Sequence, residues 1–310
     1  MKKIILKCGL SPGDIVMLSA AVRDLHKSHP DQFLTDVRTP CPAIWENNPY
    51  ITPLKEDEAE IIQAHYPLIH RSNELPYHFI HGYVQHLSQV LGVPVTPTDF
   101  RGDIYISDQE KSWISQVKEI TQDDRPFWVI VAGGKKDFTI KWWSTQRYQE
   151  VVNHYKDKIT FVQVGAKDHV HPALDNVINL VGKTDLRQLI RLIYHSSGVL
   201  CPVTAAMHLA AAVEFKHRPR GRRPCVVIAG GREPSHWEEY PGHQFIHNVG
   251  SLPCCASGGC WKSRTVALGD GSDKDGNLCV DTVLRPEETL PKCMDMIEAA
   301  DVIRRIQLYV

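Results

Sequence analysis

The stretch KKIILKCGLSPGDIVMLSAAVRDLHKSHPDQFLTDVRT, residues 2–39, decides the fold of the chain. It begins with a short apolar run that is typical of a β-strand, and SPGD then marks a tight turn. After the turn, apolar residues recur at helical spacing, at Ile15, Leu18, Val22 and Leu25. FLTDVRT indicates a second strand. A strand, a glycine turn, a helix and a strand make up a βαβ unit.

A second alternation of strands and helices begins at residue 127. The runs FWVIVAGG, ITFVQVG, VINLVG, GVLCPV and PCVVIAGG each indicate a strand, and helical segments begin at or just after Ser144, Thr184 and Thr204. Strands that alternate with helices of about 10–15 residues favour a parallel sheet covered on both faces. The sequence therefore predicts an α/β protein with two Rossmann-like lobes, whose parallel sheets face a central cleft.

Changes in composition set the predicted boundaries. A polar stretch that ends at Pro126 is the expected linker, a helix is expected over roughly 77–92, and DIYIS indicates a short strand. Residues 40–76 are proline-rich and irregular. The predicted parts are a first lobe (1–110), a linker (111–126), a second lobe (127–295) and a final helix (296–310). The second lobe contains a cysteine-rich metal-binding segment (254–293).

The composition is that of a globular protein. The chain has 310 residues, with 43% hydrophobic and 23% charged residues and a net charge of -1. This balance gives no support for binding to nucleic acid. No apolar run reaches the roughly 18 residues that would span a bilayer. The apolar run near the N-terminus is shorter than the about 7–15 residues of a signal peptide, so we expect a cytoplasmic protein.

Asp14 is the first candidate functional residue. In doubly wound sheets, ligands bind beside the turns that follow the carboxyl ends of strands, and SPGD is such a turn. A carboxylate there could act as a general base on a hydroxyl group. It could equally be an acidic residue that stabilises the first turn of the helix. Position alone leaves both interpretations open.

The segment AGGKKDFTIKWWS, residues 132–144, follows a strand and precedes a helix. Glycines allow the backbone to approach a ligand closely, and cations beside them could hold a diphosphate. The pattern is neither a P-loop nor a dinucleotide fingerprint. A solvated basic loop is the alternative. The candidate residues are Gly133, Gly134, Lys135, Lys136, Thr139 and Lys141.

The segment VTAAMHLAAA supplies a second candidate phosphate site. Thr204 and the amides after it lie at a predicted helix N-terminus that follows a strand, which is a general anion-binding arrangement. His208 falls one turn into the same helix. A structural role for this histidine is the alternative to a role in binding.

Five of the nine cysteines gather in one segment. The four other cysteines are scattered, whereas PCCASGGCWKSRTVALGDGSDKDGNLC and LPKCMDM contain Cys254, Cys255, Cys260, Cys279 and Cys293. Four thiolates can close a tetrahedral site for structural zinc or iron. A metal would stabilise a glycine- and aspartate-rich segment that cannot form an apolar core. Free buried thiols are the alternative. We expect Cys255, Cys260, Cys279 and Cys293 as ligands, with Cys254 as a rival for the first position.

In this order, these pieces resemble glycosyltransferase family 9, the ADP-heptose-dependent heptosyltransferases. The resemblance rests on SPGDIVMLSAAVRDL, GGKKDFTIKWWSTQRY, NLVGKTDLRQLIRLI and VTAAMHLAAA. It implies a GT-B fold, in which the first lobe binds the acceptor and the second binds the nucleotide sugar. It also implies that the final helix packs on the first lobe, although a contact between copies of the chain is an alternative.

Residue by residue, the resemblance implies that Asp14 is the general base, that Lys141 and Thr139 contact the phosphates of the sugar donor, and that Thr204 and His208 lie in the donor site. The family motif Asp-Thr-Gly-x-x-His is changed here, because Val203 and Ala205 replace its Asp and Gly. Ala205 is also a candidate residue of the donor site. The cysteine segment is similar to the iron-binding cluster of heptosyltransferases that act on autotransporters, with different spacing.

The resemblance therefore predicts an inverting glycosyltransferase that moves heptose or a related sugar from a nucleotide diphosphate, with ADP as the expected nucleotide, to a hydroxyl of a glycan, protein or small molecule. Cations and a helix N-terminus would hold the leaving group, so we expect no catalytic metal. Homo-oligomers are compatible with the sequence. One alternative is a nucleotide-sugar sensor without activity, favoured by Val203 and Ala205. Another is a redox enzyme with an iron–sulfur site.

Overall fold

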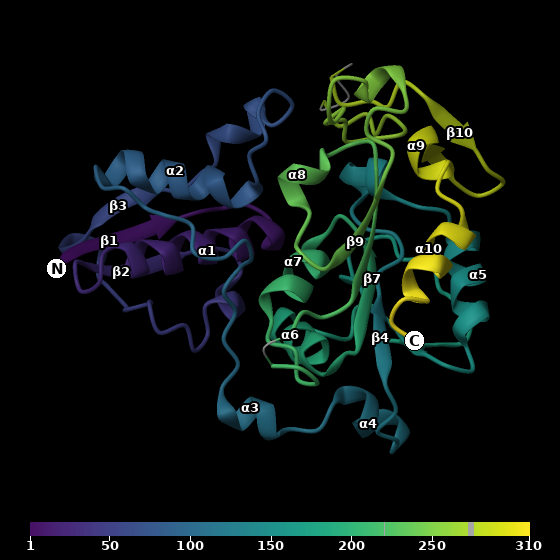
Figure 1. The fold of residues 1–310 in the computed structure, drawn as a ribbon, viewed down its shortest axis with the longest axis horizontal. Helices are drawn as coiled ribbons and strands as arrows, with labels where there is room; N and C mark the ends of the chain where they lie inside the picture. Colours follow the sequence, from purple (N-terminus) through teal and green to yellow (C-terminus); the bar gives the residue numbers. More distant parts are fainter. Residues whose placement is uncertain (220, 272–275) are drawn as a thin grey trace.

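The computed structural model describes residues 1–219, 221–271 and 276–310. Residues 272–275 belong to the predicted cysteine-rich segment, so that part of the prediction lies outside the described residues. Figure 1 shows two lobes side by side, the first in purple and blue and the second in teal to yellow. Helices α3 (Asp108–Ser112) and α4 (Gln116–Thr121) form the linker between them.

The first lobe has a three-stranded parallel sheet in the order β2-β1-β3. Its strands are β1 (Lys2–Lys7), β2 (Phe33–Arg38) and β3 (Glu60–Gln63). Its helices are α1 (Pro12–Ser28) and α2 (Phe79–Leu91), with short 3-10 turns η1 (Pro42–Ile44), η2 (Glu56–Glu58) and η3 (Pro67–Arg71). The predicted βαβ unit and the helix near 77–92 are confirmed.

Two predictions for the first lobe are wrong. Strand β3 lies inside the proline-rich stretch that indicated no regular element, and only Ile62 of its four residues is buried. Its pairing with β1, rather than an apolar pattern of its own, makes it a strand. Conversely, DIYIS forms no strand, because Ile104 makes only an isolated parallel bridge to Val213 of the second lobe.

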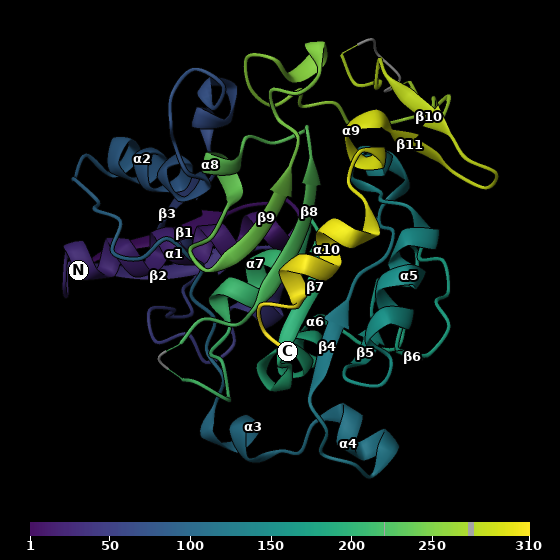
Figure 2. The ribbon, with the colours of Figure 1, turned by 45° about the vertical axis from the view of Figure 1, so that its right-hand side comes forward.

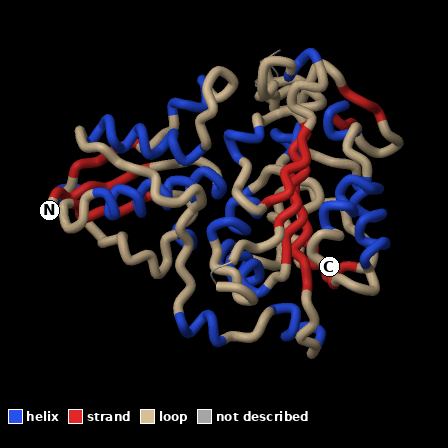
Figure 3. The backbone as a smooth tube through the Cα atoms, viewed as in Figure 1, coloured by secondary structure: helices blue, strands red, loops and turns tan. Residues whose placement is uncertain are grey.

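The second lobe has a six-stranded parallel sheet in the order β6-β5-β4-β7-β8-β9, drawn in red at the centre of Figure 3. Its strands are β4 (Phe127–Ile130), β5 (Thr160–Gln163), β6 (Val177–Asn179), β7 (Gly198–Pro202), β8 (Cys225–Gly230) and β9 (His243–His247). The five predicted strands are confirmed, and the edge strand β9 is an addition.

Helices cover both faces of this sheet, as Figure 2 shows. They are α5 (Thr145–Tyr155), α6 (Leu186–His195), α7 (Ala205–Ala212) and the short α8 (Ser235–Glu238), with the 3-10 segment η4 (Lys136–Lys141). Side chains of β4 alternate between the two faces: Phe127 and Val129 join one buried cluster, and Trp128 and Ile130 join another. The first cluster continues across α7 into α1 and so joins the lobes.

The C-terminal part extends the second lobe. It contains η5 (Pro253–Cys255), the antiparallel pair β10 (Thr282–Leu284) and β11 (Thr289–Pro291), and helices α9 (Lys292–Asp295) and α10 (Ala299–Ile306). Helix α10 contacts α5 and β8 through the buried Val302 and Ile306. The final helix therefore packs on the second lobe and not on the first. Among the described residues, no helix is both long and apolar enough to span a membrane.

Candidate functional site

Contacts between the lobes join the loops that follow three strands. In the second sheet the strand order reverses between β4 and β7, and ligands of doubly wound sheets bind at such a switch point. Lys135, after β4, donates a hydrogen bond through Nζ to Ser11 Oγ, after β1, at 3.3 Å. His208, after β7, packs against Gly13 of α1. The predicted loops thus meet where the sheets face each other.

Asp14 lies in the first turn of α1 and is largely buried. Its Oδ2 accepts a hydrogen bond from the Ser11 backbone N–H at 3.1 Å, which closes a capping box. Its Oδ1 accepts a hydrogen bond from the Tyr66 hydroxyl. Burial raises the pKa of Asp14, while the Tyr66 hydrogen bond and the Lys141 charge oppose that rise. Asp14 is therefore a carboxylate of raised basicity, as a general base requires.

A group of buried charges faces Asp14 from the second lobe. Lys141 Nζ forms an ion pair with Glu233 Oε1 at 2.8 Å, and Glu233 also pairs with Arg232. Burial raises the pKa of Glu238, and the charges of Lys141 and Arg232 oppose this shift. Burial and Arg232 lower the pKa of Lys141, against the opposing charges of Glu238 and Asp14. The cluster places cations and carboxylates of the second lobe beside the Asp14 carboxylate of the first.

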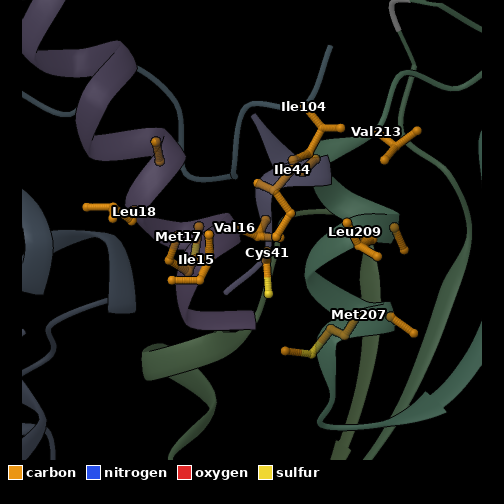
Figure 4. Close-up of a cluster of buried hydrophobic side chains, with 14 of the residues drawn as sticks. Ile15, Val16, Met17, Leu18, Cys41, Ile44, Ile104, Met207, Leu209 and Val213 are labelled. Carbon is orange, nitrogen blue, oxygen red and sulfur yellow. The ribbon is translucent and has the colours of Figure 1, made fainter. Parts of the chain in front are cut away.

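His208 is a buried neutral side chain. Its Nδ1 lies 2.5 Å from the Tyr240 hydroxyl, which also contacts Met17 of α1. Burial, together with the charge of Lys141, lowers the pKa of His208 to about 3. A Cβ atom on Gly13 would lie 2.7 Å from the His208 ring. Figure 4 shows the adjoining apolar side chains of α1 and α7. His208 therefore fixes the approach of the two helices.

The glycine pair after β4 is fixed by the backbone around it. Gly133 has φ of +91°, and a Cβ atom there would lie 2.1 Å from the Val170 carbonyl oxygen. Gly134 and Val170 exchange two backbone hydrogen bonds, of 2.8 and 3.0 Å. Only glycine fits at position 133. The contact between these two loops therefore explains why a glycine stands at position 133 after β4.

Four other predicted residues have different surroundings. The Thr139 hydroxyl accepts hydrogen bonds from the backbone N–H and the hydroxyl of Thr265 in the cysteine-rich segment, and Lys136 is exposed. Thr204 occupies the N-cap position of α7, but its hydroxyl donates to the Pro202 carbonyl at 3.3 Å. Ala205 is the first residue of α7. The amides of α7 remain at the switch point, beside the end of β7.

Four residues of the site escaped sequence analysis: Tyr66, Arg232, Glu233 and Glu238. The last three follow β8 in the sequence GREPSHWEE, so the rule that ligands gather after parallel strands could have indicated them. Tyr66 follows β3 by three residues, and that strand itself was missed.

The cysteine segment contains five of the nine cysteines: Cys254, Cys255, Cys260, Cys279 and Cys293. All nine cysteines are free. The pKa of Cys293 is raised to about 12. Burial is the largest cause, and Cys254, Cys260 and Cys279 add to the rise. Cys255 instead points its thiol at the carbonyls of Asn248 and Leu252, each at 3.5 Å. Within residues 1–219, 221–271 and 276–310, no three Cys, His, Asp or Glu side chains converge as they would around a metal ion.

The sequence matches the family described as Glycosyltransferase family 9 (heptosyltransferase) over residues 48–218, which is more than half of the chain. No curated protein matches the chain. The matched range includes the linker and the strands β4 to β7, and it ends before the cysteine segment.

Solved structures share the fold at low identity. A family 9 glycosyl transferase from Veillonella parvula DSM 2008 has a TM-score of 0.66 and 13% identity, over 99% of this chain and 97% of that one. ADP-heptose LPS heptosyltransferase II of E. coli has a TM-score of 0.57 and 16% identity, over 100% and 98%. The iron-containing dodecameric heptosyltransferase TibC of enterotoxigenic E. coli, in complex with ADP-D-beta-D-heptose, has a TM-score of 0.64 and 15% identity, over 99% and 76%.

Proposed function

Because the chain belongs to glycosyltransferase family 9 and is therefore a glycosyltransferase, we propose that it transfers heptose or a related sugar from an ADP-linked donor to a hydroxyl acceptor, with inversion at the anomeric carbon. Asp14 takes the proton of the acceptor hydroxyl, whose oxygen attacks the anomeric carbon. The bond to the diphosphate breaks on the opposite face, through an oxocarbenium-like state. A cytoplasmic location stays a prediction.

The observation that carries this proposal is the meeting of Asp14 and Lys141 across the lobes. They lie close enough for the charge of Lys141 to lower the pKa of the Asp14 carboxyl. A base from one lobe and cations from the other, at the carboxyl ends of two sheets, suit attack and departure on opposite faces of a sugar.

The lysines after β4 and the N-terminus of α7 stabilise the negative charge of the leaving diphosphate. Lys135 reaches toward the first lobe, and the diphosphate competes with Glu233 for the Lys141 ammonium. Val203 follows β7 and is buried, and its apolar side chain offers no hydrogen bond where the family motif has Asp. The sugar therefore depends on contacts other than that one.

Calorimetric titration with ADP-heptose, and with ADP-, GDP-, UDP- and dTDP-sugars as competitors, tests the proposal. We expect micromolar or tighter binding of one ADP-sugar, and weaker binding by Lys141→Ala. The exposed Lys156→Ala at the end of α5 is the matched control. Asp14→Asn should keep sugar-donor binding and lose about 100-fold or more of transfer or donor hydrolysis, since a general base contributes that much.

Three outcomes contradict parts of this proposal. Full turnover by Asp14→Asn removes the general base. Binding of a nucleotide sugar by the wild-type protein, without hydrolysis or transfer to any acceptor, favours the sensor that Val203 and Ala205 suggested. Absence of binding to every nucleotide sugar contradicts the assignment of the donor site itself.

We also propose that Cys254, Cys260, Cys279 and Cys293 hold a structural zinc or iron ion, as four thiolates can. Support comes from the pKa of Cys293, which Cys254, Cys260 and Cys279 raise, and from the pKa of Cys260, which Cys254 and Cys279 raise. Cys255 is the weaker candidate, because its thiol is turned toward two backbone carbonyls. This ligand set replaces Cys255 of the sequence-based expectation with its rival, Cys254.

Elemental analysis of purified protein tests the metal proposal. We expect about one zinc or iron ion per chain, loss of most of it in Cys254→Ser and in Cys279→Ser, and retention in Cys255→Ser. Cys41→Ser is the matched control, since Cys41 is a buried thiol of the first lobe. Metal-free wild-type protein with an ordered segment contradicts the proposal. Acid-labile sulfide with visible absorbance supports an iron–sulfur site instead of a single ion.

A further inference from the structure

Tyr66 lies where the topology of the first lobe delivers it to Asp14. Strands β1 and β3 are parallel neighbours, and the residues after their carboxyl ends share one edge of the sheet. Asp14 follows β1, and Tyr66 follows β3. The Tyr66 hydroxyl donates its hydrogen bond to Asp14 Oδ1, across 52 residues of sequence.

Aromatic packing fixes the Tyr66 ring. Its centroid lies 4.7 Å from that of Phe79, 5.0 Å from that of Tyr83 and 6.3 Å from that of Trp237, which belongs to α8 of the second lobe. A Cβ atom on Gly82 would lie 2.5 Å from the Tyr66 Cβ atom, so α2 also touches the tyrosine backbone closely. The hydroxyl is therefore held toward Asp14 from both lobes.

The far end of the same loop is attached to the cysteine-rich segment. The Asn73 side chain donates to the Gly259 carbonyl at 2.8 Å and accepts from the Gly259 N–H at 2.9 Å and from Trp261 Nε1 at 3.1 Å. Gly259 directly precedes Cys260. The loop from Tyr66 to Asn73 thus connects this segment with the Asp14 carboxylate.

We propose that Tyr66 is a positioning residue for the general base: its hydroxyl orients the Asp14 carboxylate, and Asn73 anchors the loop that carries it to the cysteine-rich segment. This inference rests on the proposed function of Asp14. A carboxylate offers about four lone-pair positions. Ser11 and Tyr66 occupy one on each oxygen, which leaves acceptor capacity in a fixed direction for the incoming hydroxyl.

The hydrogen bond also sets the basicity of Asp14. Donation from Tyr66 stabilises the charged carboxylate, so it lowers the pKa that burial raises. Removing the hydroxyl should therefore raise the pKa of Asp14. The other titratable groups around this carboxyl follow β1 or come from α2, η4, α7 and the segment around α8: Cys8, Tyr83, Lys141, His208, Arg232 and Glu238. All of them are unchanged in Tyr66→Phe.

A pH titration of protein labelled with ¹³C at the aspartate carboxyl tests the inference without an acceptor. The Asp14 resonance is assigned by its loss in Asp14→Asn. In Tyr66→Phe we expect its midpoint to rise by about one pH unit or more, the size expected for a hydrogen bond to a charged group. Tyr83→Phe is the matched control: it removes a buried hydroxyl 3.6 Å from Cys8 Sγ, next to the same ring. In Tyr83→Phe the titration midpoint of Asp14 should stay at the wild-type value.

Asn73→Ala provides a second variant that keeps Tyr66 intact. We expect faster amide hydrogen exchange over residues 66–73 and a smaller rise of the Asp14 midpoint. An unchanged midpoint in Tyr66→Phe overturns the inference, and unchanged exchange in Asn73→Ala overturns the anchoring role. Loss of transfer in Asp14→Asn with no shift in Tyr66→Phe leaves the proposed function standing and removes only Tyr66. Full transfer by Asp14→Asn removes the base, and the positioning role with it.

Discussion

The contact between the lobes and the cysteine-rich segment are held in opposite ways. Helices α1 and α7 meet through a continuous buried apolar cluster. Among its described residues, segment 254–293 buries only the apolar side chains Cys255, Leu290, Pro291 and Cys293, whereas Val280 is 70% and Leu284 is 81% exposed. Hydrogen bonds at Thr139 and Asn73 attach this segment instead.

The difference teaches where each region is sensitive. A close-packed apolar contact resists any added volume, because its neighbours cannot move independently. A segment held by a few polar bonds loses about 1 kcal/mol with each bond, and it opens locally before the rest unfolds. The weak apolar support of the segment is also the physical reason to expect a metal there.

The largest effect is expected where the lobes touch most closely. Gly13→Ala places a Cβ atom 2.7 Å from the His208 ring, which the buried Tyr240 hydroxyl holds. We expect a loss of about 1–3 kcal/mol in the free energy of unfolding from overpacking, offset in part by the better helix propensity of alanine. Denaturant unfolding measures the change. Transfer should fall as well, because residue 13 precedes Asp14.

Gly9→Ala is the matched control for this variant. Gly9 lies in the loop between β1 and α1, and a Cβ atom there meets no atom within 4 Å. Its free energy of unfolding should stay within about 0.5 kcal/mol of the wild type, as for other unconstrained surface changes. Equal losses in both variants contradict the view that shape at the α1–α7 contact controls stability.

The sequence predicts the apolar half of this comparison well. Helical spacing in α1 and the apolar runs of β4, β5, β7 and β8 are local signals that tertiary packing reinforces. Strand β3 was missed because three of its four residues are not buried, so its pairing with β1 decides its structure. Edge strand β9 was missed for the same reason: four of its five residues are not buried, and its sequence is partly polar.

The candidate site divides in a similar way. Asp14 follows β1 and Lys141 follows β4 in the sequence. Ligands of parallel sheets bind after the carboxyl ends of strands, so the positions of these two residues could be predicted from the sequence. Tyr66 and Glu233 act through contacts with residues far away in the sequence, Asp14 and Lys141, which no local pattern contains. Thr139 shows another limit of the sequence: its hydroxyl lies in the predicted loop and accepts hydrogen bonds from Thr265 of the cysteine-rich segment. Side-chain direction depends on packing that the sequence alone does not reveal.

The smallest effect is expected at that last contact. Thr139→Val keeps the size of the side chain but removes the acceptor of two hydrogen bonds, from the Thr265 backbone N–H at 2.8 Å and the Thr265 hydroxyl at 3.0 Å. We expect a loss of about 1 kcal/mol, because Thr265 is half-buried and water can reach its N–H. Hydrogen exchange should speed up over residues 260–271 and stay unchanged in α1 and α7.

A double-mutant cycle with Thr265→Val sharpens this test. The second substitution removes the hydroxyl of Thr265 but keeps its backbone N–H, so the coupling free energy between the two variants measures the hydroxyl pair alone. A coupling near zero, or a global loss of stability in Thr139→Val as large as that of Gly13→Ala, contradicts the view that hydrogen bonds attach the cysteine-rich segment to the second lobe. The segment would then share the cooperative core of the lobes, because only a region inside that core transmits a local loss to the whole fold.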